Sequence, residues 1–129
     1  MSPIPADTDV DRPLTADEAT VVQWLLEHGD GDNREFLAQL KRARVVRLCP
    51  CGCASIDFSI DGKRPQHFAM HVLSDYEWRN NLGHLCGAFV FEQDGLLAGL
   101  DSWSIDGLGI PDAMPPIERL VLHGSSTLA

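Results

Sequence analysis

The chain has 129 residues, of which 44% are hydrophobic and 22% are charged, a composition typical of one folded globular domain. Ten Lys and Arg residues oppose nineteen Asp and Glu residues, so the formal net charge at pH 7 is −9. Such a charge repels nucleic-acid phosphates and anionic membrane surfaces. We therefore expect no nucleic-acid partner and no membrane partner, whereas the charge suits either a basic protein partner or simple solubility.

The N-terminal residues carry no basic segment followed by an apolar one, and no apolar run reaches the roughly 18 residues of a membrane span. We therefore expect a cytoplasmic protein whose thiols stay reduced. Residues 1–13 contain three prolines and three aspartates among few apolar groups and are predicted as a flexible leader. One domain over 14–122 and a tail over 123–129 complete the predicted organisation.

Two helices are predicted at the start of this domain. The stretch LTADEATVVQWLLEHG opens with Thr15 and Glu18 at the spacing of a capping box, continues as a broad apolar stripe, and ends at Gly29. A second, shorter helix begins after the N-cap candidate Asn33. Together they predict a helical hairpin over residues 16–42.

After residue 42 the apolar period changes from about 3.6 to 2, which indicates strands. The stretches ARVVRLC, ASIDFSIDG and HFAMHVL are predicted strands, and HLCGAFVFEQDGLLAGLDSWSI predicts two more, joined by a hairpin turn at Asp94 and Gly95. The predicted fold class is α+β, with the helical hairpin packed on a mainly antiparallel sheet of four to five strands. The two periods predict one shared core that contains Trp24, Leu25, Phe36, Leu40, Phe58, Phe89 and Phe91.

Over residues 14–105 the chain resembles a group of small uncharacterised bacterial proteins. The likeness rests on LTADEATVVQWLL, on LAQLKRARVVRLCPCGCASIDFSI with its CxCGCxS motif, and on FVFEQDGLLAGLDSW. It implies a bacterial source and a compact α+β layout, and it implies no catalytic residues. The stretch SDYEWRNNLG departs from the pattern of the group and suggests a local specialisation.

Three of the four cysteines, Cys49, Cys51 and Cys53, alternate along the chain. With Cys86 or His84 they could hold a soft metal ion, and thiol-redox chemistry is a further alternative. However, the C-x-x-C spacing typical of structural zinc sites and redox motifs is missing, and the intervening proline and glycine indicate a turn. We therefore predict that these cysteines pack under the helices, with no metal ligands and no cofactor.

No complete catalytic motif occurs, so we predict no catalytic residues and a protein that is not an enzyme. A nucleophilic pair of Cys53 and His71 lacks any family-specific signature. The aspartates follow strands or precede glycines, as in turns, and they do not have the spacing of an EF-hand.

The stretch SDYEWRNNLGH is predicted as a loop that presents aromatic and charged side chains, the types that anchor protein interfaces. The alternative is that Trp78 folds back onto the core. Trp103 lies close to acidic residues in a second patch. The predicted partner-binding residues are Asp75, Tyr76, Glu77, Trp78, Arg79, Asp101 and Trp103.

The predicted function is that of a small acidic binding or inhibitor protein of the immunity or antitoxin type, which neutralises a basic toxin domain by covering it. The alternative is a zinc-binding or thiol-redox module centred on CPCGC.

Overall fold

The computed structural model describes residues 9–50, 52–67 and 69–123. Its elements are β1 (Asp9–Pro13), α1 (Ala16–Glu27), α2 (Arg34–Leu40), β2 (Ala43–Leu48), β3 (Ile56–Ile60), β4 (His71–Arg79), β5 (Leu85–Gln93), β6 (Leu96–Ser104), the 3-10 helix η1 (Ile117–Arg119) and β7 (Val121–Leu122). None of the described helices has the length and apolar character that a membrane span requires.

The described strands form one seven-stranded sheet in the order β1-β2-β3-β6-β5-β4-β7, in which neighbours are antiparallel. The α+β class is confirmed, but the predicted count of four to five strands is wrong. The two strands that sequence reasoning missed lie at the sheet edges. β1 falls inside the predicted leader and ends at Pro13, and β7 has two residues, so neither shows a readable alternation. Residues 1–8 and 124–129 of the predicted leader and tail lie outside the described residues.

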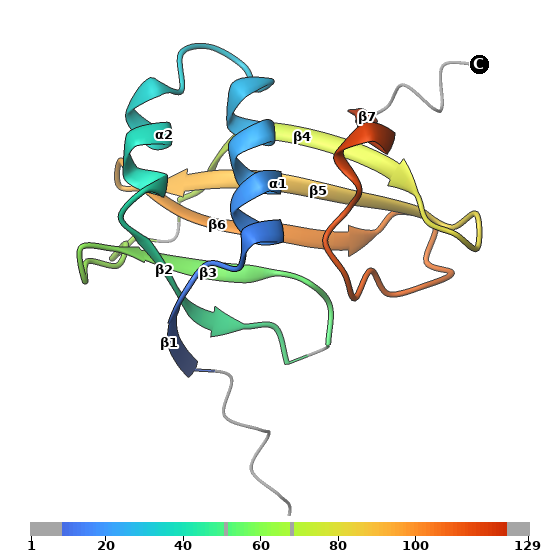
Figure 1. The fold of residues 1–129 in the computed structure, drawn as a ribbon, viewed down its shortest axis with the longest axis horizontal. Helices are drawn as coiled ribbons and strands as arrows, with labels where there is room; N and C mark the ends of the chain where they lie inside the picture. The colour runs from blue at the N-terminus through green and yellow to red at the C-terminus, as the bar shows by residue number, and fades with distance from the viewer. Residues whose placement is uncertain (1–8, 51, 68, 124–129) are drawn as a thin grey trace, which may run out of the picture.

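Both α-helices lie on the same face of the sheet (Figure 1). The predicted capping box of α1 is present, because the Glu18 N–H donates to Thr15 Oγ1 at 3.1 Å and the Thr15 N–H donates to Glu18 Oε1 at 2.9 Å. Arg12 of β1 donates to both oxygens of the same Glu18 carboxylate, at 2.8 and 2.9 Å. This ion pair ties the edge strand to the start of α1.

The predicted hairpin turn between β5 and β6 is confirmed. Asp94 and Gly95 have φ angles of 56° and 75°, and Gln93 pairs with Leu96 across the turn. Two successive positive φ values are characteristic of a type I′ turn, whose twist matches that of antiparallel strands.

The core lies between the helices and the sheet. Leu25 and Phe58 are buried in it, and the predicted core residues Trp24, Phe36 and Leu40 pack partly buried against it. Phe91 is buried as predicted, with 4% of its surface exposed, but the prediction that Phe89 and Phe91 belong to this core is wrong. In β5 the small side chains Ala88 and Val90 belong to this core, so alternation directs the two phenylalanines to the opposite face.

Candidate functional site

The stretch predicted to be an exposed recognition loop is a strand. Residues 75–79 belong to β4, and only residues 80–84 connect it to β5. Tyr76 and Trp78 face the helices and are 8% and 4% exposed. The Tyr76 hydroxyl donates to the backbone oxygen of His28 at the end of α1, at 2.9 Å. Neither aromatic side chain is therefore available as a surface anchor.

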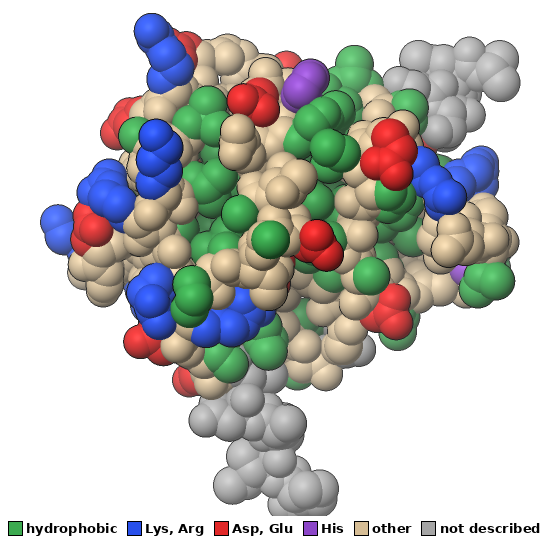
Figure 2. Space-filling view, viewed as in Figure 1, with side chains coloured by type: hydrophobic (Ala, Val, Ile, Leu, Met, Phe, Trp, Pro, Cys, Tyr) green, Lys and Arg blue, Asp and Glu red, His purple; other side chains and the backbone are tan. Residues whose placement is uncertain are grey.

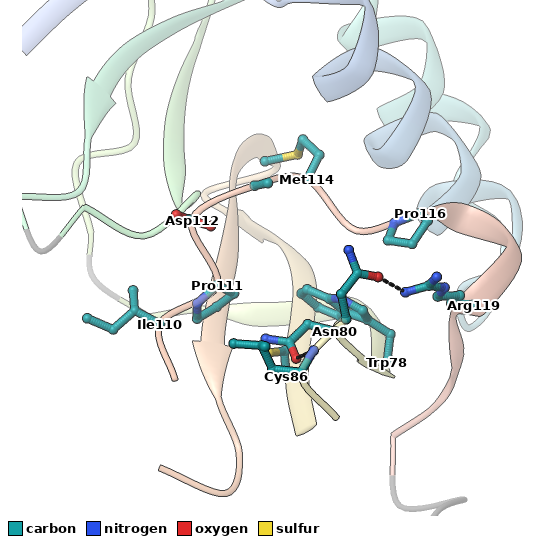
Figure 3. Close-up of a pocket in the computed structure, with 12 residues that line it drawn as sticks. Trp78, Asn80, Cys86, Ile110, Pro111, Asp112, Met114, Pro116 and Arg119 are labelled. Carbon is teal, nitrogen blue, oxygen red and sulfur yellow. Dashed lines mark hydrogen bonds between the residues drawn. The ribbon is translucent and has the colours of Figure 1, made fainter. Parts of the chain in front are cut away.

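Trp78 instead lines a cavity of about 450 Å³ beneath the segment that precedes η1 (Figure 3). Cys86 lies beside it, and Met114 and Pro116 lie on the opposite side. Arg119 closes one end by donating to Asn81 Oδ1 at 2.8 Å. The role of Trp78 is thus to cap the core. Arg79, the last predicted residue of this stretch, is exposed and donates to the Gly83 oxygen at 2.9 Å.

The other predicted residues come together on the second face of the sheet. Asp75 pairs with Phe89, which pairs with Asp101, while Glu77 pairs with Gly87, which pairs with Trp103. Residues opposite each other in neighbouring strands point to the same side. Among the described elements neither α-helix covers this side, which we call the open face.

The open face carries a group that we call the carboxylate–aromatic patch. Asp57 of β3 joins it, because its partner Gly99 lies two residues from Asp101 on the same side of β6. The patch consists of Asp57, Asp75, Glu77, Phe89, Asp101 and Trp103. Asp57 and Phe89 were not predicted as site residues. The alternation of SIDFSI and GAFVF could have placed both on the face opposite the core.

Trp103 is held flat against the sheet. Its Nε1 atom would lie 2.5 Å from a Cβ at residue 87, so only a glycine there permits this position of the indole. The ring of His123 stands edge-on to Trp103, with 5.8 Å between centroids. His123 Nδ1 also lies 3.4 Å from Oε1 of Glu77, which is only 1% exposed. Trp103 itself is 40% exposed and presents a free ring surface to solvent.

A cavity of about 490 Å³ adjoins the patch. It is lined by the end of β2, by the connection between β2 and β3, and by residues of β3, β5 and β6. We call it the Asp57–Asp101 cleft after its two carboxylates. Its other lining residues are Arg47, Leu48, Cys49, Pro50, Cys53, Ser55, Ile56, Phe89, Ser102 and Trp103. The cleft therefore combines acidic groups, aromatic rings and the cysteine turn.

Burial raises the pKa of both cleft carboxylates above the usual value for aspartate. For Asp57 the positive charges of Arg47 and Arg64 offset part of this effect, whereas for Asp101 the charge of Asp57 adds to it. Burial also raises the pKa of Asp75, with His123 opposing and Glu77 reinforcing the rise. The patch thus holds negative charge in a poorly solvated position, which favours the approach of a cation.

Cys49 and Cys53 are half-buried beside the cleft and are not members of the core cluster, so the prediction that they pack under the helices is wrong. They line a second cavity, of about 420 Å³, with Thr15, Asp17 and Glu18 at the start of α1, so they lie beside the first turn of this helix and outside the core. Cys86 is fully buried, and burial raises the pKa of its thiol. Within the described ranges no three His, Cys, Asp or Glu side chains are arranged to hold a metal ion, and Cys51 lies outside those ranges.

Comparison with known proteins found no matching family model, no matching curated protein and no matching solved structure. The resemblance to small bacterial proteins with a CxCGCxS motif therefore stays a prediction.

Proposed function

We propose that this chain is a small acidic binding protein that holds a basic segment of a protein partner against the carboxylate–aromatic patch. The observation that carries the proposal is a sheet face, uncovered by either α-helix, on which carboxylates surround the exposed ring of Trp103. Aromatic anchors surrounded by complementary charge are typical of protein interfaces. An inhibitor of the immunity or antitoxin type, acting in the cytoplasm on a basic toxin domain, would use such a surface.

The distribution of charge supports this choice of face. Residues 65–129, which supply β4, β5 and β6, contain eight Asp and Glu residues but only two Lys and Arg residues. On the helix-covered face, Lys and Arg side chains gather mainly on the side of α2 and β2, at the left of Figure 2. Three of these eight carboxylates, those of Asp75, Glu77 and Asp101, lie on the open face, where Asp57 of β3 adds a fourth. This cluster of negative charge attracts a basic partner to the open face.

One variant pair tests the proposal. The parent chain is immobilised and exposed to an extract of its source organism, and captured proteins are identified by mass spectrometry. The proposal expects a partner with a basic surface whose capture is lost in Trp103→Ala and in Asp101→Asn. The matched control is Glu27→Gln with Glu35→Gln, which removes two exposed negative charges from the helices. Equal capture by the parent and by both open-face variants would refute the proposal.

The zinc-binding or thiol-redox module remains the alternative, because Cys49 and Cys53 line the same cleft as Asp57 and Asp101. Metal analysis of protein purified under reducing conditions without added zinc separates the two functions. Stoichiometric metal that is lost in Cys51→Ser would favour the module. Metal-free protein that retains its partner would favour the binding protein.

A further inference from the structure

The Asp57–Asp101 cleft has two carboxylates that no other described group satisfies. Neither side chain forms a hydrogen bond or an ion pair with another described residue, although each is half-buried. Arg47, which also lines the cleft, acts on Asp57 only through its charge. The oxygens of both side chains are not among the buried atoms that lack a partner, so in the free protein they face solvent and are available to a donor that enters the cleft.

Ser55 and Ser102 also line the cleft. The Ser55 hydroxyl is already paired with the backbone of Ser102, accepting from its N–H at 2.8 Å and donating to its oxygen at 3.1 Å. The Ser102 side chain points to the helix-covered side of β6, because Ser102 pairs with the core residue Ala88, so its Oγ atom does not face the cleft. The polar groups of this lining that remain for a ligand are therefore the two carboxylates.

One wall of the cleft is aromatic. Trp103 and Phe89 both line it, and Gly87 fixes the plane of the Trp103 ring against the sheet. Asp57 and Asp101 are diagonal neighbours across β3 and β6, a relationship that separates Cα atoms by about 7–8 Å. A flat cation with several donors fits between two carboxylates at this separation and stacks on an indole.

We propose that the Asp57–Asp101 cleft receives an arginine side chain from the basic segment of the protein partner. This inference rests on the proposed function and names the chemistry of the residue that enters. A guanidinium group carries five donors in one plane, whereas a lysine ammonium is compact, strongly hydrated and unable to stack. The cleft volume of about 490 Å³ accommodates the whole side chain.

Blocked pentapeptides test the inference without the partner in hand. The probe is acetyl-Gly-Gly-Arg-Gly-Gly-amide, added to the full ¹⁵N-labelled chain while the three tryptophan indole N–H signals are followed by NMR. We expect the arginine peptide to move the Trp103 signal and to leave the signals of buried Trp78 and half-buried Trp24 in place. The lysine peptide should bind about threefold more weakly, and the neutral citrulline peptide should produce no shift.

The variants and controls complete the test. Asp57→Asn with Asp101→Asn should raise the Kd of the arginine peptide about tenfold or more, whereas Glu27→Gln with Glu35→Gln should leave it unchanged. Free L-arginine should bind more weakly than the peptide, because its own carboxylate is repelled. The inference is overturned if the arginine and citrulline peptides act alike, if the double Asn variant binds as the parent does, or if free arginine binds as tightly as the peptide.

These outcomes are distinct from failure of the proposed function. If the arginine peptide fails to bind while partner capture still depends on Trp103, only the arginine assignment is wrong. If capture is independent of Trp103 and Asp101, the proposed function itself is wrong.

Discussion

The indole of Trp103 occupies the space that a side chain at Gly87 would fill. A Cβ at residue 87 would lie 2.5 Å from Nε1, 3.0 Å from Cε2 and 3.1 Å from Cδ1 of Trp103. The two residues face each other across β5 and β6, so the glycine is what lets the ring lie against the sheet on the open face.

Gly87→Ala should therefore lift the Trp103 ring and destabilise the fold. Overpacking of this kind costs about 1–3 kcal/mol of unfolding free energy. Chemical denaturation of the parent, of Gly87→Ala, of Trp103→Ala and of the double variant measures the coupling. Because Trp103→Ala removes the clash, Gly87→Ala should then cost little or nothing. Equal costs in both backgrounds would show that Trp103 does not depend on Gly87.

Trp78 and Trp103 should behave in opposite ways. Trp78 is 4% exposed in the core, whereas Trp103 is 40% exposed on the open face. Trp78→Ala should lower the unfolding free energy by about 3–5 kcal/mol, as for large-to-small core substitutions. Trp103→Ala should leave the melting temperature nearly unchanged and reduce partner capture. Thermal melting and partner capture are measured on both variants. A Trp78→Ala variant as stable as the parent would contradict this assignment.

The sequence predicts the strongly periodic elements of this fold but not its edges. The capping box at Thr15 and the turn at Asp94 depend on local chemistry, and both are confirmed. β1 and β7 form by pairing with the edge strands β2 and β4. This pairing leaves no alternation of apolar residues in the short sequences of β1 and β7, so the sequence does not predict them. Trp78 was assigned to a loop because its strand continues past the apolar run of HFAMHVL into charged residues.

The site is only half predictable for a related reason. Asp101 and Trp103 lie two residues apart in one predicted strand, so the sequence alone predicts that they share a face. Their neighbours Asp57 and Phe89 come from other strands, and the order β3-β6-β5 that joins them reflects long-range pairing. An aromatic residue in an apolar strand is also a natural core candidate, and for that reason Phe89 was placed on the wrong face.

Association with a basic partner should depend on salt mainly through its rate. Because the patch attracts the partner over distance, raising the salt concentration should slow association far more than it accelerates dissociation. Stopped-flow or surface-plasmon measurements with the captured partner give both rates. An association rate that is unchanged between low and high salt would exclude electrostatic steering by the open face.

The Arg12–Glu18 pair should stabilise the fold above the acid range. The hydrogen bonds from Arg12 are the largest cause of the lowered pKa of Glu18, and burial opposes them. Glu18→Gln keeps a side chain that can complete the capping box but removes the charge, so it should cost about 1–3 kcal/mol at pH 7. A group with a lowered folded-state pKa stabilises fully above its unfolded value, about 4.3 for glutamate, and loses this contribution as the pH falls through the folded value.

Denaturation of the parent and of Glu18→Gln across this range checks the sign. The stability difference should be largest near neutral pH and should shrink in acid. Asp17→Asn, which removes an exposed carboxylate from the same helical turn, is the matched control and should show a much smaller difference. A difference that grows as the pH falls would contradict the assignment.

The carboxylates of Asp57 and Asp101 should make the stability of the fold depend on pH in the opposite direction to Glu18. The pKa of Asp57 and of Asp101 is raised by burial, so the folded state binds these protons more tightly than the unfolded chain does. Stability should therefore fall as the pH rises from about 3.9, the ordinary value for aspartate, through the raised folded-state values. Asp57→Asn with Asp101→Asn removes this penalty and should melt at a higher temperature than the parent at pH 7, with the gain vanishing in acid.

Bound arginine peptide should remove the same penalty in the parent, because its charge stabilises both ionised carboxylates. If the double variant melts below the parent at pH 7, the two carboxylates stabilise the free protein and are not held in readiness for a cation.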